Sequence, residues 1–262
     1  MEKVILQEVN HNVRIGNKCE YKEPNIIKDS IFYLDGEPVG FYMTQMTHKM
    51  CKLANVANKE LRSKNVPKQG TSRITEKKRA FDEKRAEDYE IMQYSTIIGS
   101  VARNEVFKRH YENRSSVHSV KSAQTFIKAM LMLAKESEQL IKEIMPKQYE
   151  AQKNLFEDVD KKWRFGNLFT SSISNYNISA PFHRDTGNIK GAVNVIICKR
   201  NNSKGGDLHV PDYDITIGQK DNSILVYPAW KNIHGVTPII PTHEGGYRNS
   251  LIFYPLKAFK GI

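Results

Sequence analysis

The sequence has few cysteines, no long apolar run and no internal repeat. Its three cysteines, Cys19, Cys51 and Cys198, lie far apart and form no CxxC pair, which argues against a disulfide framework and a cysteine-built zinc site. No run approaches the roughly 18 apolar residues of a membrane-spanning helix. The first residues, MEKVILQEVNHN, lack the apolar segment of a secretory signal. We therefore expect a protein of the reducing cytoplasm with no membrane partner.

Acidic residues are outnumbered by basic ones. The 262 residues include 40 lysines and arginines against 29 aspartates and glutamates, a formal net charge of +11. An excess of this size often accompanies a polyanionic partner, and nucleic acid is the usual one. The alternative is that the lysines merely keep a soluble protein monomeric, and charge alone does not decide between the two.

Residues 1–160 are predicted to be a helical, basic N-terminal half. A hairpin is expected over residues 31–43, because aromatic and β-branched residues flank the turn pair Asp35-Gly36. Apolar residues at helical spacing then predict a helix over residues 46–61.

Residues 59–85 break this pattern, since they combine many lysines and arginines with Pro and Gly. They are predicted to form a basic loop that ends in a charged helix around residues 76–89, although such charge runs are usually solvated linkers. The clearest helix is predicted over residues 122–145, where Ser122 can cap its start and Pro146 ends it.

From about residue 163 onward, short β-rich runs alternate with Gly, Asn, Asp and Pro. Seven or more short strands at this spacing are typical of an antiparallel sandwich or barrel. The predicted fold class is therefore α+β, with a β-rich core over residues 163–262 and N-terminal helices packed against it. We expect a single domain over residues 1–262.

The β-rich part contains an HxD motif, His183-Arg184-Asp185, just after a predicted strand. On an extended backbone residues i and i+2 point to the same side, so His183 and Asp185 can converge. His234 follows at the start of another short strand. Two imidazoles and one carboxylate form the facial triad of non-haem Fe(II) oxygenases, which leaves positions open for a co-substrate and dioxygen.

A second motif, Arg248-Asn249-Ser250, follows on a predicted strand. A guanidinium suits bidentate capture of a carboxylate, and a hydroxyl on the same face adds a hydrogen bond, as the distal carboxylate of 2-oxoglutarate would require. Asn175 and Asn177, which precede the HxD, either bond the co-substrate's carboxylate, the interpretation preferred here, or satisfy backbone groups at a strand end.

Each motif has an ordinary alternative when taken singly. His183 and Asp185 could form a surface pair, His234 could be a turn histidine, and Arg248 could make a surface salt bridge. Their joint occurrence in this order favours the iron site. His209 and His243 lack an HxD context and are interpreted as non-ligands.

The stretch from PFHRDTGNIKG to IHGVTPI, closed by YRNSLIFYP, resembles the Fe(II)/2-oxoglutarate dioxygenases of the TET/JBP group, and most of all their compact bacteriophage members. HRD followed by Asn188, the GGDL turn, the strand DNSILVYP and HGVTP carry the resemblance. It covers about residues 171–255. The chain lacks the cysteine-rich region of the animal TET enzymes, which leaves the exact target base open.

The resemblance implies a double-stranded β-helix, or jelly-roll, core with Fe(II), 2-oxoglutarate and O2 as cofactors. On this reading His183, Asp185 and His234 hold the iron and form the catalytic centre, and Arg248 binds 2-oxoglutarate with help from Ser250. The implied reaction hydroxylates the 5-methyl group of 5-methylcytosine or thymine in DNA, in the cytoplasm of an infected bacterial cell.

A base in duplex DNA lies within the stack, so such an enzyme needs it extruded or single-stranded. Holding the strand calls for lysines and arginines that neutralise phosphates, together with aromatic wedges. The N-terminal half supplies both, and Tyr111 lies among the basic residues. The predicted DNA-contacting residues are Lys64, Lys68, Arg73, Lys77, Lys78, Arg79, Arg109 and Arg114.

Two other functions stay open at this point. A hydroxylase of protein side chains or small molecules would share the iron site, but its rim would be neutral or acidic. A nucleic-acid-binding protein with an inactive dioxygenase core would be expected to have lost a ligand of the triad.

Overall fold

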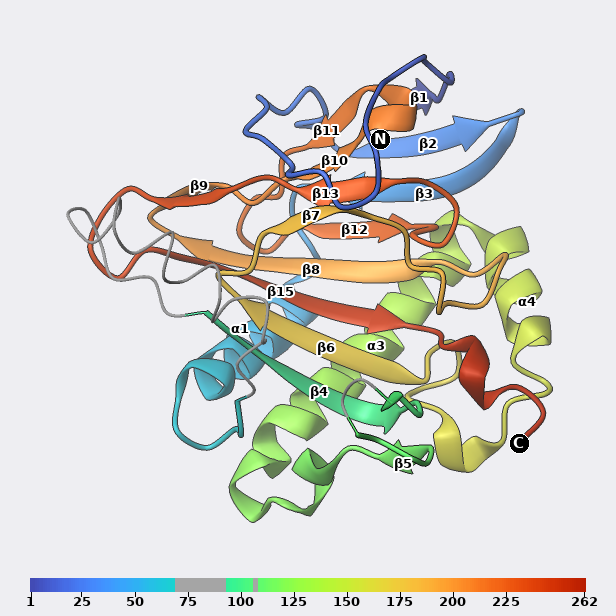
Figure 1. Ribbon diagram of the computed structural model, residues 1–262, viewed down its shortest axis with the longest axis vertical. Coiled ribbons are helices and arrows are strands. Elements are labelled where there is room, and N and C mark those ends of the chain that lie inside the picture. The colour runs from blue at the N-terminus through green and yellow to red at the C-terminus, as the bar shows by residue number, and fades with distance from the viewer. Residues whose placement is uncertain (69–92, 106–107) are drawn as a thin grey trace.

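A computed structural model arranges the chain around one large, mainly antiparallel sheet (Figure 1). It describes residues 1–68, 93–105 and 108–262. The strand order is β1-β2-β3-β12-β8-β15-β6-β4-β5, and the β1–β2 pair is parallel. These strands are β1 (Glu2–Ile5), β2 (Ser30–Leu34), β3 (Glu37–Met43), β4 (Tyr94–Val101), β5 (Asn113–Arg114), β6 (Ser171–Tyr176), β8 (Asn194–Asn201), β12 (Ile224–Tyr227) and β15 (Tyr247–Tyr254).

A smaller sheet has the strand order β11-β10-β13-β7. Its strands are β7 (Ala180–His183), β10 (Leu208–Val210), β11 (Ile215–Ile217) and β13 (His234–Val236). A separate two-stranded ribbon pairs β9 (Ser203–Gly205) with β14 (Ile239–Pro241). The main helices are α1 (His48–Arg62), α3 (Gln124–Ile144) and α4 (Pro146–Leu155).

Two apolar clusters show how these layers stack. Phe41 and Val195 of the large sheet belong to a cluster that includes apolar residues of α1 and α3. Their chain neighbours Tyr42 and Ile196 belong to a second cluster with residues of β10 and β11. Because successive side chains in a strand point to opposite faces, the large sheet packs on the helices with one face and on the small sheet with the other.

The predicted hairpin over residues 31–43 is confirmed by β2 and β3. Asp35 and Gly36 both have positive φ angles, +50° and +82°, as a tight two-residue hairpin turn requires. The strands predicted from the C-terminal β-rich runs are confirmed as well by β6, β8, β10, β11, β12, β13 and β15.

The helix predicted over residues 46–61 is confirmed by α1, whose cap is Thr47: its hydroxyl accepts from the Met50 amide at 3.3 Å. The prediction that Ser122 caps the next helix was wrong. Its hydroxyl donates to the Asn65 carbonyl, and Ala123 precedes α3 without a side-chain cap. Pro146 ends α3 but also begins α4, at a position where its missing N–H costs nothing.

The N-terminal half is less purely helical than predicted. It contributes β1 to β5 to the large sheet. β1, β2 and β3 form one edge, β4 and β5 form the other, and the C-terminal strands lie between them. The charged helix expected around residues 76–89 lies outside the described residues, as do residues 69–85 of the basic loop. Across the described ranges, no helix combines the length and the apolar character that crossing a membrane would require.

Residues 7–29, here called the N-terminal segment, run along the small sheet. Gly16 donates its amide to the Phe182 carbonyl at 2.7 Å, on the β7 edge. At the opposite edge, the Gly218 amide donates to the Ile26 carbonyl at 2.9 Å, and Ile26 also bridges to Ile217 of β11. The segment therefore occupies both edges of the small sheet, where open backbone groups would otherwise invite aggregation.

Candidate metal centre

His183 and His234 are brought together by strand pairing. They are register partners on the antiparallel strands β7 and β13, and their ring centroids lie 4.4 Å apart. β7 is not a continuation of β6: the chain leaves the large sheet at Tyr176 and enters the small one at Ala180. This crossing carries the HxD motif onto the small sheet beside His234.

Asp185 lies just beyond the end of β7, where its amide donates to the Ala229 carbonyl at 3.1 Å. Its Oδ1 is 3.6 Å from His183 Nε2. Its Oδ2 accepts from Asn194 Nδ2 at 3.1 Å, and Asn188 Nδ2 donates to Asn194 Oδ1 at 2.9 Å. The two asparagines hold one carboxylate oxygen and leave the other facing the histidines.

Backbone carbonyls orient both imidazoles. His183 Nδ1 lies 2.8 Å from the Pro181 carbonyl, and His234 Nδ1 lies 3.1 Å from the Asn232 carbonyl. A carbonyl oxygen can only accept, so each Nδ1 carries the proton and each Nε2 carries the lone pair. This second contact is the usual way in which proteins fix a metal-binding histidine.

The three side chains form a compact donor set. One ligand atom from each of His183, Asp185 and His234 lies within 4.8 Å of the others. His234 is 4% exposed, and burial followed by the charge of His183 lowers its pKa. The side chains of His183 and Asp185 are 39% and 33% exposed, so the cluster is open on their side. Two neutral imidazoles and a carboxylate fit Fe(II) with positions left for other ligands.

Arg248 and Ser250 lie on β15 and share a face with Asn194. Ser250 pairs with Cys198 and Arg248 with Arg200 on β8. Cys198 and Arg200 are an even number of residues from Asn194, so their side chains and those of their partners point to the same face of the sheet as Asn194. Arg248 is 2% exposed, and its burial lowers the pKa of its guanidinium. A buried cation on the face that leads to the cluster fits a carboxylate-binding role.

The two predicted asparagines have different positions. The Asn177 side chain accepts from the Arg248 amide at 2.8 Å, while its own amide donates to the Arg248 carbonyl at 2.9 Å. Asn177 therefore satisfies backbone groups at the strand end, the interpretation that sequence reasoning did not prefer. Asn175 is opposite Ser250 on β6 and is partly buried, on the same face as the candidate co-substrate site.

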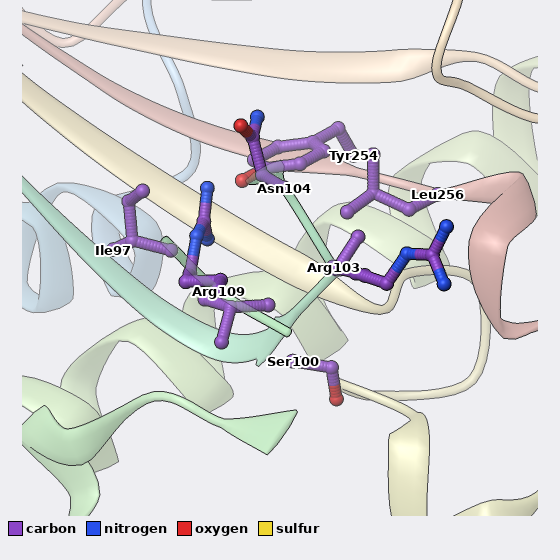
Figure 2. Close-up of a pocket in the computed structure, with 9 residues that line it drawn as sticks. Ile97, Ser100, Arg103, Asn104, Arg109, Tyr254 and Leu256 are labelled. Carbon is purple, nitrogen blue, oxygen red and sulfur yellow. The ribbon is translucent and has the colours of Figure 1, made fainter. Parts of the chain in front are cut away.

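A cavity of about 200 Å³ lies at the far end of β15, lined by Asn104, Arg109, Tyr254 and neighbouring apolar groups (Figure 2). The β8–β15 register, extended by one pair beyond Phe253, places Tyr254 opposite Asn194. Burial, and then the charge of Asp185, raise the pKa of the Tyr254 phenol. Tyr254 is therefore the lining residue that relates the cavity to the surroundings of Asp185, and no member of the cluster lines the cavity itself.

Of the eight predicted DNA-contacting residues, the four that the structure describes have different surroundings. Lys64 is exposed beyond α1. Lys68 is engaged within the protein, since its Nζ donates to the Ser63 carbonyl at 2.6 Å and lies 4.7 Å from the centre of the Tyr94 ring. Arg109 lines the cavity, and half-buried Arg114 donates to a backbone carbonyl. Arg73, Lys77, Lys78 and Arg79 lie outside the described residues.

Sequence reasoning missed several residues that shape the site. Tyr227 places its ring edge-on to His234, with ring centroids 5.9 Å apart. The carbonyls of Pro181 and Asn232 gave no motif, because a backbone acceptor has no sequence signature. Asn194 acts through its side chain but is distant from the HxD in sequence. His209, interpreted as a non-ligand, is outside the cluster, and its Nδ1 contacts the Ile215 carbonyl at 2.9 Å.

Comparison with known structures identifies the fold. The structure of NgTET1 in complex with 5mC DNA is similar with a TM-score of 0.60 at 14% identity, over 95% of this chain and 84% of that one. OsALKBH1 (TM-score 0.43, 11% identity, 84% and 97% coverage) and a 2OG-Fe(II) oxygenase family protein from Caulobacter crescentus (0.47, 10%, 83% and 77%) are more distant. The predicted jelly-roll fold class is confirmed.

No curated protein matches the chain by sequence. Residues 103–257, however, match the Tet_JBP family, the oxygenase domain of the 2OGFeDO superfamily, whose members use Fe(II), 2-oxoglutarate and O2. The match spans more than half of the 262 residues and contains the whole cluster and Arg248. The chain is therefore an oxygenase that belongs to the Tet_JBP family.

Proposed function

We propose that this oxygenase hydroxylates the 5-methyl group of a pyrimidine base in DNA, with 5-methylcytosine as the preferred substrate and thymine as the second. The observation that carries the proposal is the complete His183–Asp185–His234 cluster within a Tet_JBP match. The similarity in fold to NgTET1, whose structure contains 5mC DNA, supports the same substrate class.

In this proposal each side chain of the cluster has a defined task. His183 and His234 present Nε2 lone pairs to Fe(II), and Asp185 presents the oxygen that its asparagine partners leave free. Arg248, with Ser250 beside it, binds the distal carboxylate of 2-oxoglutarate. When bound, iron and co-substrate supply the oxidation of a C–H bond by dioxygen, with succinate and carbon dioxide as by-products.

In this proposal, residues outside the metal cluster and the co-substrate site receive the DNA base. Because the target methyl group lies within the duplex stack, the base must leave the stack to reach the exposed side of the cluster. In this proposal the cavity beside Tyr254, which is also lined by Asn104 and Arg109, contributes to the surface that the base meets. Nearby Tyr111 is 80% exposed, and the net charge of +11 suits a phosphate backbone.

One incubation tests the substrate. Purified protein, Fe(II), ascorbate and 2-oxoglutarate are incubated with single- or double-stranded DNA that contains both bases, and the digested nucleosides are analysed by mass spectrometry. We expect 5-hydroxymethylcytosine, and 5-hydroxymethyluracil would move the preference to thymine. Succinate without either nucleoside would instead indicate a protein or small-molecule hydroxylase, and no succinate at all would indicate an inactive core.

A pair of variants tests the metal assignment. Asp185→Ala removes the only carboxylate of the cluster and is expected to abolish turnover while the fold persists. Asp160→Ala, which removes an exposed carboxylate that caps a short 3-10 helix, serves as the control and should retain activity. Wild-type turnover of 2-oxoglutarate by Asp185→Ala with added Fe(II) would show that the assignment is wrong.

A further inference from the structure

Near Arg248, the candidate co-substrate site contains two further polar side chains besides Ser250: that of Arg200, which is mostly buried, and that of Gln219, which is buried. Arg248 and Arg200 are direct cross-strand partners, so two cations lie opposite each other inside the protein. Like charges in this position destabilise a sheet unless other groups compensate them. Gln219, which is 1% exposed, lies between the two arginines and contacts both.

Arg200 is held by the protein itself. Its Nη1 donates to the Gln219 carbonyl at 2.8 Å, and its Nη2 donates to the carbonyls of Ser203 and Gly205 at 2.7 and 2.9 Å. Asp207 Oδ1 lies 3.8 Å from the same guanidinium. These contacts compensate the charge of Arg200 and occupy both of its terminal nitrogens.

Gln219 has a fixed orientation. Arg248 Nη2 donates to Gln219 Oε1, and a guanidinium cannot accept a hydrogen bond, so the amide oxygen, not the amide nitrogen, is the atom that meets Arg248 Nη2. The Gln219 backbone amide donates to Asp207 Oδ1 at 2.9 Å, and the Asp207 amide donates in turn to Thr237 Oγ1 at 3.0 Å. Both ends of Gln219 are therefore anchored.

Three donors at this place have no acceptor. Gln219 Nε2, Arg248 Nε and Arg200 Nε are all buried, and none has a hydrogen-bond partner among the residues that the structure describes. Leaving a buried donor without a partner costs free energy comparable to a lost hydrogen bond. A carboxylate on Arg248, which has two acceptor oxygens and a negative charge, would satisfy Gln219 Nε2 and Arg248 Nε and neutralise Arg248.

The stem of Arg248 is also confined. A Cβ atom on Gly206 would lie 3.1 Å from Arg248 Cδ, and Gly206 has a φ angle of +70° that favours glycine. The backbone at Gly206 therefore packs closely on the arginine stem, so the guanidinium is held before any ligand arrives.

From this arrangement we propose that Gln219 is a positioning residue for 2-oxoglutarate: its Oε1 orients the Arg248 guanidinium and its Nε2 donates to the distal carboxylate of the co-substrate. The inference rests on the co-substrate site of the proposed function and deepens it. It concerns the distal carboxylate alone, so it is independent of which base, or which other substrate, is oxidised.

The test measures co-substrate binding without turnover. The Fe(II)-loaded protein is titrated under anaerobic conditions with 2-oxoglutarate, and binding is followed by the visible absorbance of the Fe(II)–2-oxo acid complex. A parallel titration uses 2-oxopentanoate, which has the same chain length and 2-oxo acid group but no distal carboxylate. For Gln219→Leu we expect the Kd of 2-oxoglutarate to rise about tenfold or more, whereas the Kd of 2-oxopentanoate stays unchanged.

A matched control is Gln152→Leu. Gln152 is another fully buried glutamine, and its side-chain amide bonds only backbone groups of Leu168 and Val193. We expect this variant to lower the melting temperature without changing either Kd. If Gln219→Leu fails to fold, Gln219→Glu takes its place: it keeps the acceptor for Arg248 but opposes a second carboxylate, and should weaken 2-oxoglutarate selectively.

Each result decides the proposal. An unchanged Kd for 2-oxoglutarate in the Gln219 variants, equal weakening of both 2-oxo acids, or no 2-oxoglutarate binding by the wild-type protein would overturn it. Selective weakening supports it. If the wild-type protein binds 2-oxoglutarate but yields no oxidised nucleoside, the proposed DNA function fails while this inference stands.

Discussion

The Asp185 carboxylate depends on a residue that no motif contains. Asn194 holds Asp185 Oδ2 from β8, so it sets the direction of the other oxygen. Removing such a partner of a metal ligand typically costs 10–100-fold in metal affinity. We therefore expect Asn194→Ala to weaken Fe(II) binding by about that factor, as measured by equilibrium competition with a metal indicator.

The control for this variant is Asn167→Ala, which removes the amide of an exposed asparagine that bonds Glu138 and not the cluster. It should leave Fe(II) affinity unchanged. Equal losses in the two variants would mean that Asn194 acts only through the stability of the fold.

Glu138 is a buried carboxyl outside the site. Burial raises its pKa above the ordinary 4.5, although the amides of Asn167 and Leu168 and the side chain of Asn167 oppose this shift. The folded protein therefore keeps this proton to higher pH than the unfolded chain does. Because the folded state binds more protons in this window, the free energy of unfolding falls as pH rises from the ordinary pKa through the raised one.

The corresponding variant is Glu138→Gln, which keeps an acceptor for both backbone amides and cannot ionise. Urea unfolding between about pH 4 and pH 7 should show a flatter decline of stability with pH in this variant than in the wild type. Glu143→Gln, on the exposed side of the same helix, should retain the wild-type slope. An identical slope in Glu138→Gln would contradict the assignment.

At the scale of elements, the connection between β4 and β5 borders the cavity and carries Arg109 and Tyr111. Tyr111 is 80% exposed, and its ring meets that of His110 edge-on with ring centroids 6.5 Å apart. We expect Tyr111→Ala to raise the KM for DNA about tenfold or more, since stacking on a base is worth roughly 1–3 kcal/mol.

The same variant should leave the Kd of 2-oxoglutarate unchanged, because Arg248 is buried on another part of β15. Tyr21→Ala, which removes a tyrosine that is 41% exposed on the N-terminal segment, is the control. If both variants have wild-type KM values for DNA, the β4–β5 connection is not part of the DNA-binding surface.

These elements also show which parts of the site the sequence can predict. The HxD motif, His234 and the alternation on β15 follow from local spacing, so the cluster and the face of Arg248 could be predicted. The crossing between β6 and β7 could not, because the signal for each strand does not say which sheet it joins. The bonds between Asn177 and Arg248 could not be predicted for the same reason, since they depend on the register of two distant segments.

At the scale of the whole molecule, the charge of +11 predicts how salt acts on the enzyme. Binding to DNA through phosphate contacts releases counterions, so log K should fall linearly with log salt, with a slope of about −0.9 for each contact in duplex DNA. Binding of 2-oxoglutarate should change little, because Arg248 is buried and screened weakly. Fluorescence titrations of labelled DNA and anaerobic 2-oxoglutarate titrations, over the same salt range, measure both.

If the affinity for DNA does not change with salt concentration, the basic residues do not contribute to nucleic-acid binding through phosphate contacts. A steep response for both ligands would place Arg248 in contact with solvent ions, against the burial described above. Only the combination of a steep DNA response and a shallow 2-oxoglutarate response agrees with the proposed function.

The N-terminal segment has a consequence for how the protein is made. Its contacts join Gly16 to Phe182 and Ile26 to Gly218, and His11 contacts Asp212, whose carboxylate also accepts from Asn232 behind His234. During synthesis the ribosome releases this segment before the strands that it covers. The segment must therefore wait unpaired until β13 has been made, and the small sheet closes through contacts of very long sequence separation, which form slowly.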